Sequence, residues 1–207
     1  FCDGIGAVPL AAERIWPGRV CAHAWEISEQ ATLIAARNLP HLQHHGDLLA
    51  FNFEAIESLL RELPDVPILV AAGFPCQDNS SLKKTRKGIY GPKSKLIFDI
   101  SKILTNIAMV QRKLHRTAEV FRLFENVMGV TKDDSDMVRK LTNTFEPVVL
   151  DAAEQAHATR RRKWWLSHNL LPRDAEAWTT DKDGTRTLAG WGTKPEAPWA
   201  EKGWSMV

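Results

Sequence analysis

A short apolar run in the first half of the chain ends abruptly and is followed by a cysteine. The run covers residues 68–72 and breaks at Gly73, after which Pro75 and Cys76 follow. An apolar run of this length, bounded by glycine and proline, is typical of a buried strand in a parallel sheet. Open α/β sheets bind ligands at the carboxyl ends of their strands, so the sequence predicts a functional thiol at Cys76.

Two further apolar runs adjoin polar residues of the kind that active sites use. The run 120–124 is followed by Glu125 and Asn126, and Arg160 and Arg162 precede a third run. Alone, the acidic motif is a common polar loop after a strand, and the row of cations around the arginines could equally be a solvated edge. Three strand ends in this order favour one assembled site.

The amino end of the chain predicts a nucleotide-like ligand. Gly4 and Gly6 form a glycine turn, a short apolar helix is expected at 8–15, and Glu26 ends a strand expected at 20–25. This layout binds nucleotides, and an acidic residue on the next strand can accept both ribose hydroxyls. A glycine pair alone is more often a plain turn, but Glu26 favours the ligand-binding interpretation.

Six short motifs in this order resemble those of the cytosine-5 DNA methyltransferases, which use S-adenosylmethionine. They are Gly4-x-Gly6, Glu26, Gly46-Asp47, Pro75-Cys76-Gln77, Glu125-Asn126-Val127 and Arg160-x-Arg162. Residues 86–90 and 123–130 are most similar to the de novo subgroup of eukaryotic enzymes, and the resemblance covers residues 1–169. It implies an α/β fold with a doubly wound, mostly parallel sheet, of the Rossmann-like methyltransferase type.

The resemblance implies a covalent mechanism on a cytosine that is flipped out of the duplex. Cytosine C5 is a weak nucleophile, so the Cys76 thiolate would first add to C6 and make C5 reactive toward the methyl group. Glu125 would bind the N3 and amino edge of the ring. It can donate a hydrogen bond there only when protonated, so we expect burial to raise its pKa. The alternative for Cys76 is a buried, inert cysteine.

The resemblance also implies the remaining roles, residue by residue. Arg162 would hold the cytosine O2, Arg160 would align Glu125 or the cysteine loop, and Asn126 would orient that loop. Pro75 is counted with the catalytic group. The expected cofactor-binding residues are Phe1, Gly4, Ile5, Gly6, Glu26, Ile27, Asp47, Leu48, Pro75 and Leu96. Asp47 could equally be a capping residue in a turn.

A basic segment directly follows the cysteine loop. Six lysines and arginines, and no acidic residue, lie between Asp78 and Asp99. We expect four of these cations to contact the phosphates of double-stranded DNA: Lys83, Lys84, Arg86 and Lys87. The alternative is a solvated loop, because the net charge of +2 is too small to indicate nucleic acid by itself.

Composition and cysteine content narrow the remaining possibilities. With 207 residues, 44% of them hydrophobic, the chain can bury one substantial core, and no segment is long and apolar enough to span a bilayer. The three cysteines include no Cys-x-x-Cys pair, which argues against a disulfide framework and a zinc site, so no metal is expected. A reducing compartment follows, the nucleus in a eukaryote and otherwise the cytoplasm.

The chain is expected to form a partial catalytic domain over residues 1–169 and an irregular tail over 170–207 that could begin a target-recognition region. Strands are predicted at 20–25, 66–72, 120–125, 147–151 and 163–167, and helices at 8–15, 28–38, 53–63, 96–110 and 136–143. Prolines and glycines make the tail poor in helix and strand. The strand that should lead into Phe1 is absent, so we expect a fragment, incomplete at both ends, with a gap between strands 20–25 and 66–72.

Three functions stay open at this point, with DNA cytosine-5 methylation preferred. A non-catalytic regulatory paralogue would typically lose the cysteine or the glutamate, and both are present. An enzyme acting on tRNA would usually carry two prolines before the cysteine and another after the glutamine, whereas this loop reads Gly73-Phe74-Pro75-Cys76-Gln77-Asp78. Besides DNA, a regulatory paralogue or a second copy of the chain is a candidate partner, and a membrane is not.

Overall fold

A six-stranded sheet forms the centre of the protein in its computed structural model, which describes residues 1–2, 4–75, 88–92, 94–154, 160–168, 178–180 and 186–188. The strands are Ile68–Gly73 (β3), Val120–Val127 (β4), Val148–Asp151 (β5), Arg161–Leu166 (β6), Trp178–Thr180 (β7) and Arg186–Leu188 (β8). Their order in the sheet is β3-β4-β6-β5-β8-β7. Strands β3, β4, β5 and β8 point one way and β6 and β7 the other, which confirms the mostly parallel sheet expected from the sequence.

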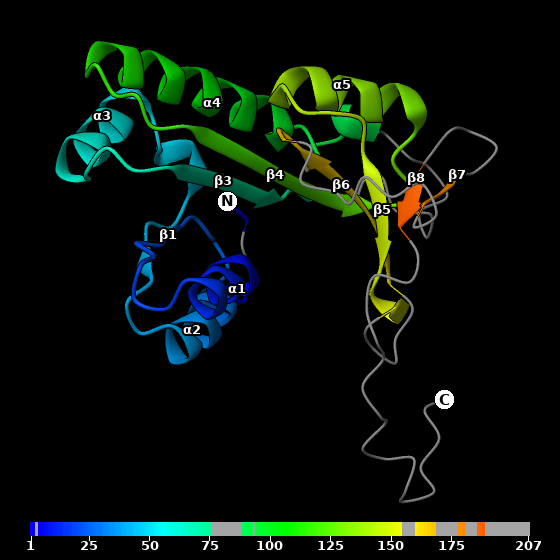
Figure 1. Cartoon of the computed structure of the whole chain (residues 1–207), viewed down its shortest axis with the longest axis horizontal. Coiled ribbons are helices and arrows are strands. Elements are labelled where there is room, and N and C mark those ends of the chain that lie inside the picture. The colour runs from blue at the N-terminus through cyan, green and yellow to red at the C-terminus, as the bar shows by residue number, and fades with distance from the viewer. Residues whose placement is uncertain are drawn as a thin grey trace, which may run out of the picture.

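Helices cover both faces of the sheet region. They are Ala7–Ile15 (α1), Glu29–Asn38 (α2), Phe53–Glu62 (α3), Leu96–Lys113 (α4) and Lys132–Thr142 (α5), with short 3-10 helices at Leu48–Ala50 (η1), Gly88–Tyr90 (η2) and Ala152–Glu154 (η3). Figure 1 shows α3, α4 and α5 on one side of the sheet and α1 and α2 on the other. Within the described residues, no helix combines the length and apolar character needed to cross a membrane.

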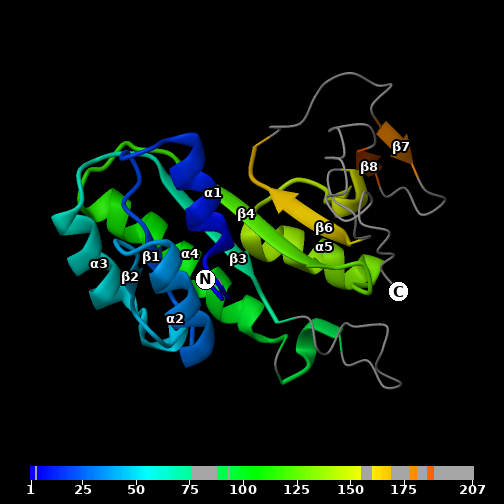
Figure 2. The same cartoon turned by 90° about the horizontal axis from the view of Figure 1, so that it is seen from below.

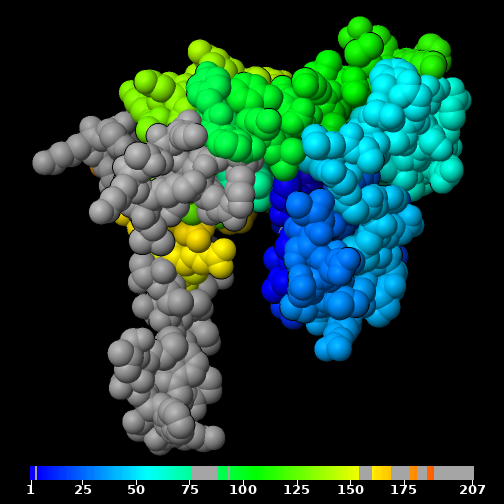
Figure 3. Space-filling model, turned by 180° about the vertical axis from the view of Figure 1, so that it is seen from behind, coloured from blue at the N-terminus to red at the C-terminus, as the bar shows by residue number. Residues whose placement is uncertain are grey.

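The first fifty residues form a unit that packs on the main core and has its own two-stranded parallel sheet, made of His23–Ala24 (β1) and Gln43–His44 (β2). The end marked N lies between this small sheet and β3 (Figure 2). The amino group of Phe1 donates to the Ala71 carbonyl oxygen at 2.6 Å, and the Cys2 amide donates to the Trp25 carbonyl oxygen at 2.9 Å. The backbone of Phe1 and Cys2 therefore bonds to both of the regions that were expected to flank a gap. Figure 3 shows this unit projecting to the same side of the molecule as the end of β5.

The main hydrophobic core lies between the sheet and the helices α3, α4 and α5. Phe124 of β4 and Trp165 of β6 are fully buried there. The apolar positions of α4 recur every three or four residues, from Ile97 to Val110, which gives the helix one buried face. A second, smaller cluster packs α2 against β1 and is formed by Ala24, Ala35, Leu39 and Leu42.

Several predicted boundaries are wrong, and polar helix ends account for most of the differences. Helix α5 begins at Lys132 and not at residue 136, because Thr131 caps it by accepting from the Asp134 amide at 3.2 Å. Two acidic residues in its first turn stabilise the helix, because their negative charges lie at the positive end of the helix dipole. Helix α4 continues to Lys113, with basic residues in its last turn. The strand expected at 20–25 is reduced to two residues.

The region from residue 170 onward contains regular structure that the sequence did not predict. Strand β8 pairs in parallel with β5, and β7 pairs antiparallel with β8. The guanidinium of Arg186 lies 4.4 Å from the centre of the Trp178 ring and ties the two strands together. The expectation of an irregular tail is therefore wrong for these six residues. The rest of the tail lies outside the described residues, and the domain boundary at 169 stays a prediction.

The packing of the core predicts the effect of truncating a buried side chain of α4. Ile100→Ala removes a side chain that is 0% exposed, and we expect it to lower the free energy of unfolding by roughly 2–5 kcal/mol, because a cavity replaces packed atoms. Urea denaturation measures this. Met109→Ala on the same helix, at a position that is 54% exposed, is the control and should change stability by no more than about 0.5 kcal/mol. Equal losses in both variants would contradict this description of the core.

Candidate active site

The carboxylate of Glu125 lies directly beside the strand that leads to the cysteine. Glu125 of β4 and Gly73 of β3 are paired in the parallel ladder. A Cβ atom at Gly73 would lie 3.4 Å from the Glu125 Oε2 atom, so the glycine leaves the backbone open to the carboxylate. Gly73 precedes Cys76 by three residues. The structure thus brings the expected acid to the strand end where the expected nucleophile follows.

The partner of this carboxylate comes from the antiparallel strand β6. Arg162 lies opposite Val127 in the ladder, and its Nε atom is 2.8 Å from the Glu125 Oε1 atom. The two side chains are 26% and 24% exposed, so the ion pair is only partly shielded from water. The resemblance had assigned the alignment of Glu125 to Arg160 and the base to Arg162. In the structure, the direct contact with Glu125 belongs to Arg162.

Burial raises the pKa of the Glu125 carboxyl above its ordinary value, as expected from the sequence. The charges of Arg162 and Arg160, and the hydrogen bond from Arg162, act in the opposite direction but do not cancel the effect of burial. A carboxyl of this kind can carry a proton at a higher pH than an exposed glutamate. It can then donate a hydrogen bond to an acceptor such as a ring nitrogen.

Two buried side chains hold the backbone just before Cys76. The Asn126 side chain, 1% exposed, donates from Nδ2 to the Phe74 carbonyl oxygen at 3.1 Å. The Ser94 hydroxyl, 0% exposed, donates to the Pro75 carbonyl oxygen at 3.0 Å. Successive carbonyls are therefore tied down by β4 and by the segment before α4. This agrees with the role expected of Asn126, whereas Ser94 was missed, because its only local signal is a small polar residue before an apolar helix.

The glycine turn and Glu26 meet at the amino end, as the sequence predicted. Gly4 and Gly6 have φ values of +59° and +81°, in the left-handed region that glycine tolerates best. The Gly4 amide donates to Glu26 Oε2 at 2.9 Å, and the Ser28 amide donates to Glu26 Oε1 at 2.9 Å. Each carboxylate oxygen keeps a further lone pair for a ligand. The cofactor roles of these residues stay predictions.

The other residues expected to contact the cofactor differ in their exposure to solvent. Ile5 and Ile27 are 54% and 77% exposed, whereas Leu48 is 3% exposed and belongs to the core. Asp47 accepts from the Leu49 amide at 2.9 Å and caps η1, which is the capping alternative that the sequence left open.

Phe1 and Leu96 are more sheltered. The ring of Phe1 packs edge-on against Trp25, with 5.1 Å between the ring centres, and Leu96 is partly buried at the start of α4. Both side chains pack against the main core. Their expected contacts with a cofactor remain untested.

Several expected residues lie outside the described part of the chain. They are Cys76 and the basic residues Lys83, Lys84, Arg86 and Lys87. Pro75, the residue before the cysteine, is described and partly buried. Among the described residues, no group of three or more histidine, cysteine, aspartate or glutamate side chains could hold a metal ion.

Comparison with known proteins places the chain among methyltransferases. The model of the family "C-5 cytosine-specific DNA methylase" matches residues 1–154. The type II methyltransferase M2.BsuMI of Bacillus subtilis (strain 168) is 29% identical over 125 residues, which cover 60% of this chain and 27% of that protein.

Two solved structures share the fold. One, from an E. coli prophage and described as a DNA modification methyltransferase, has a TM-score of 0.54 at 21% identity and covers 87% of this chain and 49% of its own. The other, a variant of Spodoptera frugiperda DNMT2, has a TM-score of 0.58 at 15% identity and covers 99% of this chain and 58% of its own. The chain thus spans about half the length of these structures and about a quarter of the Bacillus protein.

The ion pair predicts how the Glu125 carboxyl titrates. Arg162→Gln removes the contact that lowers the pKa, so we expect the pKa of Glu125 to rise further, because burial then acts with less opposition. Carboxyl-detected NMR titration measures this shift. Arg161→Gln is the matched control, since Arg161 is not among the groups that shift this pKa. A pKa that falls in Arg162→Gln, or moves equally in the control, would contradict the assigned contact.

Proposed function

Because the chain belongs to the C-5 cytosine-specific DNA methylase family, we propose that it transfers a methyl group from S-adenosylmethionine to C5 of cytosine in double-stranded DNA. The position of Glu125 carries this proposal. Its carboxyl lies against Gly73, three residues before Cys76, and burial raises its pKa. A proton donor and a thiol at one strand end are what addition to a pyrimidine ring requires.

The Cys76 thiolate is the nucleophile in this proposal. A sulfur lone pair forms the bond to C6, and the π electrons of the ring move through C5 and C4 toward N3, where protonated Glu125 donates a hydrogen bond. The electron-rich C5 then takes up the methyl group. Loss of the C5 proton to solvent and cleavage of the C6–sulfur bond restore the ring double bond and return the thiolate. Every bond that forms at Cys76 is thus broken again.

Arg162 has two tasks in the proposed cycle. Without a base it pairs with Glu125 and favours the charged carboxylate. Cytosine offers the guanidinium another partner, the O2 atom, and release of Glu125 from the ion pair would favour the protonated carboxyl. The partial exposure of both side chains supports such an exchange, because neither is locked in the core. Arg160 adds a more distant positive charge to the same carboxyl.

The amino-terminal turn fits the expected cofactor. Among the described residues, no atom lies within 4 Å of the point where a Cβ atom of Gly4 would stand, so a ligand can approach that backbone closely. Glu26 would accept the ribose hydroxyls beside it, and Phe1, Ile5, Ile27, Asp47, Leu48, Pro75 and Leu96 are the other proposed contacts. When bound, S-adenosylmethionine would supply an electrophilic methyl group and leave as S-adenosylhomocysteine.

DNA is the proposed partner, with Lys83, Lys84, Arg86 and Lys87 as the proposed phosphate contacts. Flipping a base out of the duplex costs a few kcal/mol, and contacts with the phosphates would help to offset that cost. The proposed location is the nucleus in a eukaryote and the cytoplasm otherwise. A paralogue or a second copy of the chain is a further proposed partner.

Trapping of the covalent adduct tests the proposed function. Duplex DNA that contains 5-fluorocytosine, incubated with the protein and labelled S-adenosylmethionine, should give a stable protein–DNA adduct, because fluorine cannot leave C5 as a proton does. Denaturing electrophoresis detects the adduct, and Cys76→Ser should abolish it. An adduct that forms with tRNA but not with DNA would overturn the proposed substrate. An adduct that still forms in Cys76→Ser would overturn the proposed nucleophile.

Loss of the buried hydrogen bond from Ser94 should slow the formation of the covalent adduct. Ser94→Ala releases the Pro75 carbonyl, and we expect the rate of adduct formation to fall roughly three- to tenfold, the equivalent of one net hydrogen bond. The dissociation constant for DNA should stay the same. Ser101→Ala is the matched control, because the Ser101 hydroxyl also donates to a carbonyl, that of Leu141 at 2.8 Å, away from the cysteine loop. Equal rates in the two variants would contradict a positioning role for Ser94.

A further inference from the structure

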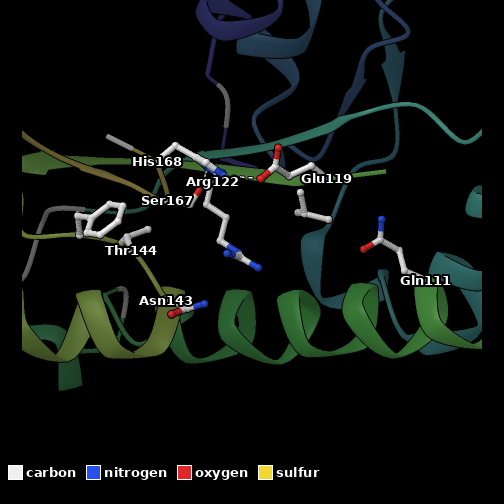
Figure 4. Close-up of a pocket in the computed structure, with 9 residues that line it drawn as sticks. Gln111, Glu119, Arg122, Asn143, Thr144, Ser167 and His168 are labelled. Atoms are coloured by element: carbon white, nitrogen blue, oxygen red, sulfur yellow. Dashed lines mark hydrogen bonds and ion pairs between the residues drawn. The ribbon is translucent and has the colours of Figure 1, made fainter. Parts of the chain in front are cut away.

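A cavity of about 490 Å³ lies at the opposite end of β4 from Glu125. It opens between the first residues of β4, the end of β6 and the segment that follows α5 (Figure 4). The described residues that line it are Gln111, Glu119, Val120, Arg122, Asn143, Thr144, Phe145, Ser167 and His168. A volume of this size suits a small molecule.

The guanidinium of Arg122 is the most unusual group in this cavity. Side chains alternate along a strand, so Arg122 lies on the same face of β4 as Phe124, the face covered by helices. Figure 4 shows its side chain running from the sheet toward the helix layer. Within the described part of the chain, the guanidinium has no ion pair or hydrogen bond, although the Arg122 backbone pairs with Ser167.

The acidic residue among the described lining residues, Glu119, does not neutralise Arg122. Glu119 is bound to His168, with 2.6 Å between the Glu119 Oε1 and His168 Nε2 atoms, and Figure 4 shows its carboxylate on the other side of the strand. Burial lowers the pKa of the Arg122 guanidinium, and no charge among the described residues contributes to that shift. A half-buried cation that lacks a partner costs free energy, which an anion in the cavity would recover.

A second donor faces the same space. Asn143 ends α5 in the left-handed conformation, with φ at +49°, and Figure 4 shows its side chain beside the helix, on the same side of the sheet as the Arg122 guanidinium. In the described structure, the Asn143 side-chain amide has no hydrogen-bond partner. A guanidinium and an amide across one cavity can together bind the oxygens of a phosphate or a carboxylate.

We propose that this cavity binds a small oxyanion, a molecule with a phosphate or carboxylate group, held by the Arg122 guanidinium and the Asn143 amide. The site is separate from the proposed methyl-transfer site, because Arg122 and Glu125 lie on opposite faces of β4. The proposal does not depend on the proposed activity. It follows from a guanidinium and an amide that have no side-chain partner among the described residues, and from the cavity that both of them line.

Binding of two simple anions tests the proposal. Inorganic phosphate and citrate are titrated into the protein at constant ionic strength, with calorimetry and the thermal unfolding midpoint as readouts. We expect at least one anion to bind saturably and to raise the midpoint, because a ligand that binds only the folded state stabilises it. Binding of phosphate alone or of citrate alone identifies which oxyanion the site prefers.

Three variants locate that binding. Arg122→Gln should weaken it at least tenfold and, without anion, leave the unfolding midpoint the same or higher, since a half-buried charge is removed. Asn143→Gly should weaken it less while it keeps the left-handed backbone. Arg37→Gln, at an exposed position on α2, is the control and should bind as the original chain does. No saturable binding of either anion, or unchanged binding in Arg122→Gln, would overturn the proposal.

Discussion

The register of β3, β4 and β6 is the constraint on which the candidate active site depends. It sets Glu125 beside Gly73 on one strand and within ion-pair distance of Arg162 on the other. A slip of one residue would turn Glu125 to the opposite face of the sheet. The core prevents that slip, because Phe124 and Trp165 lie on the helix-covered face and are fully buried. The position of the acid is therefore determined by hydrophobic packing on the other side of the same strands.

The site combines rigid neutral groups with adjustable charged ones. Asn126 and Ser94 are buried, and each holds one carbonyl of the loop that leads to the cysteine. To leave such buried groups unpaired would cost about 1–3 kcal/mol each, so the loop is held firmly where it leaves β3. Glu125 and Arg162 remain partly open to water and can exchange partners at lower cost. The proposed chemistry needs both properties, a fixed nucleophile and a carboxyl that changes its protonation state.

Strand β4 carries a charged residue near each end, and the two ends differ in how those charges are paired. Glu125 has a guanidinium partner on the neighbouring strand. Arg122 has no partner among the described residues and lies in a cavity. The proposed methyl transfer uses none of the residues that line this cavity, so the proposed anion site is separate from the proposed methyl-transfer site.

The local sequence determined much of this protein: the order of apolar runs indicated the α/β fold, and the polar residues that end those runs led to the predictions for Glu125, Asn126 and Glu26. Local sequence patterns predicted less well the segments in which polar residues form the helix or strand, so the start of α5 and the strands β7 and β8 were missed. Only the tertiary structure decided that Arg162 contacts Glu125, that Ser94 holds Pro75 and that the Arg122 guanidinium has no partner among the described residues. These contacts join residues far apart in the chain, and their distances depend on packing and register, which no local pattern encodes.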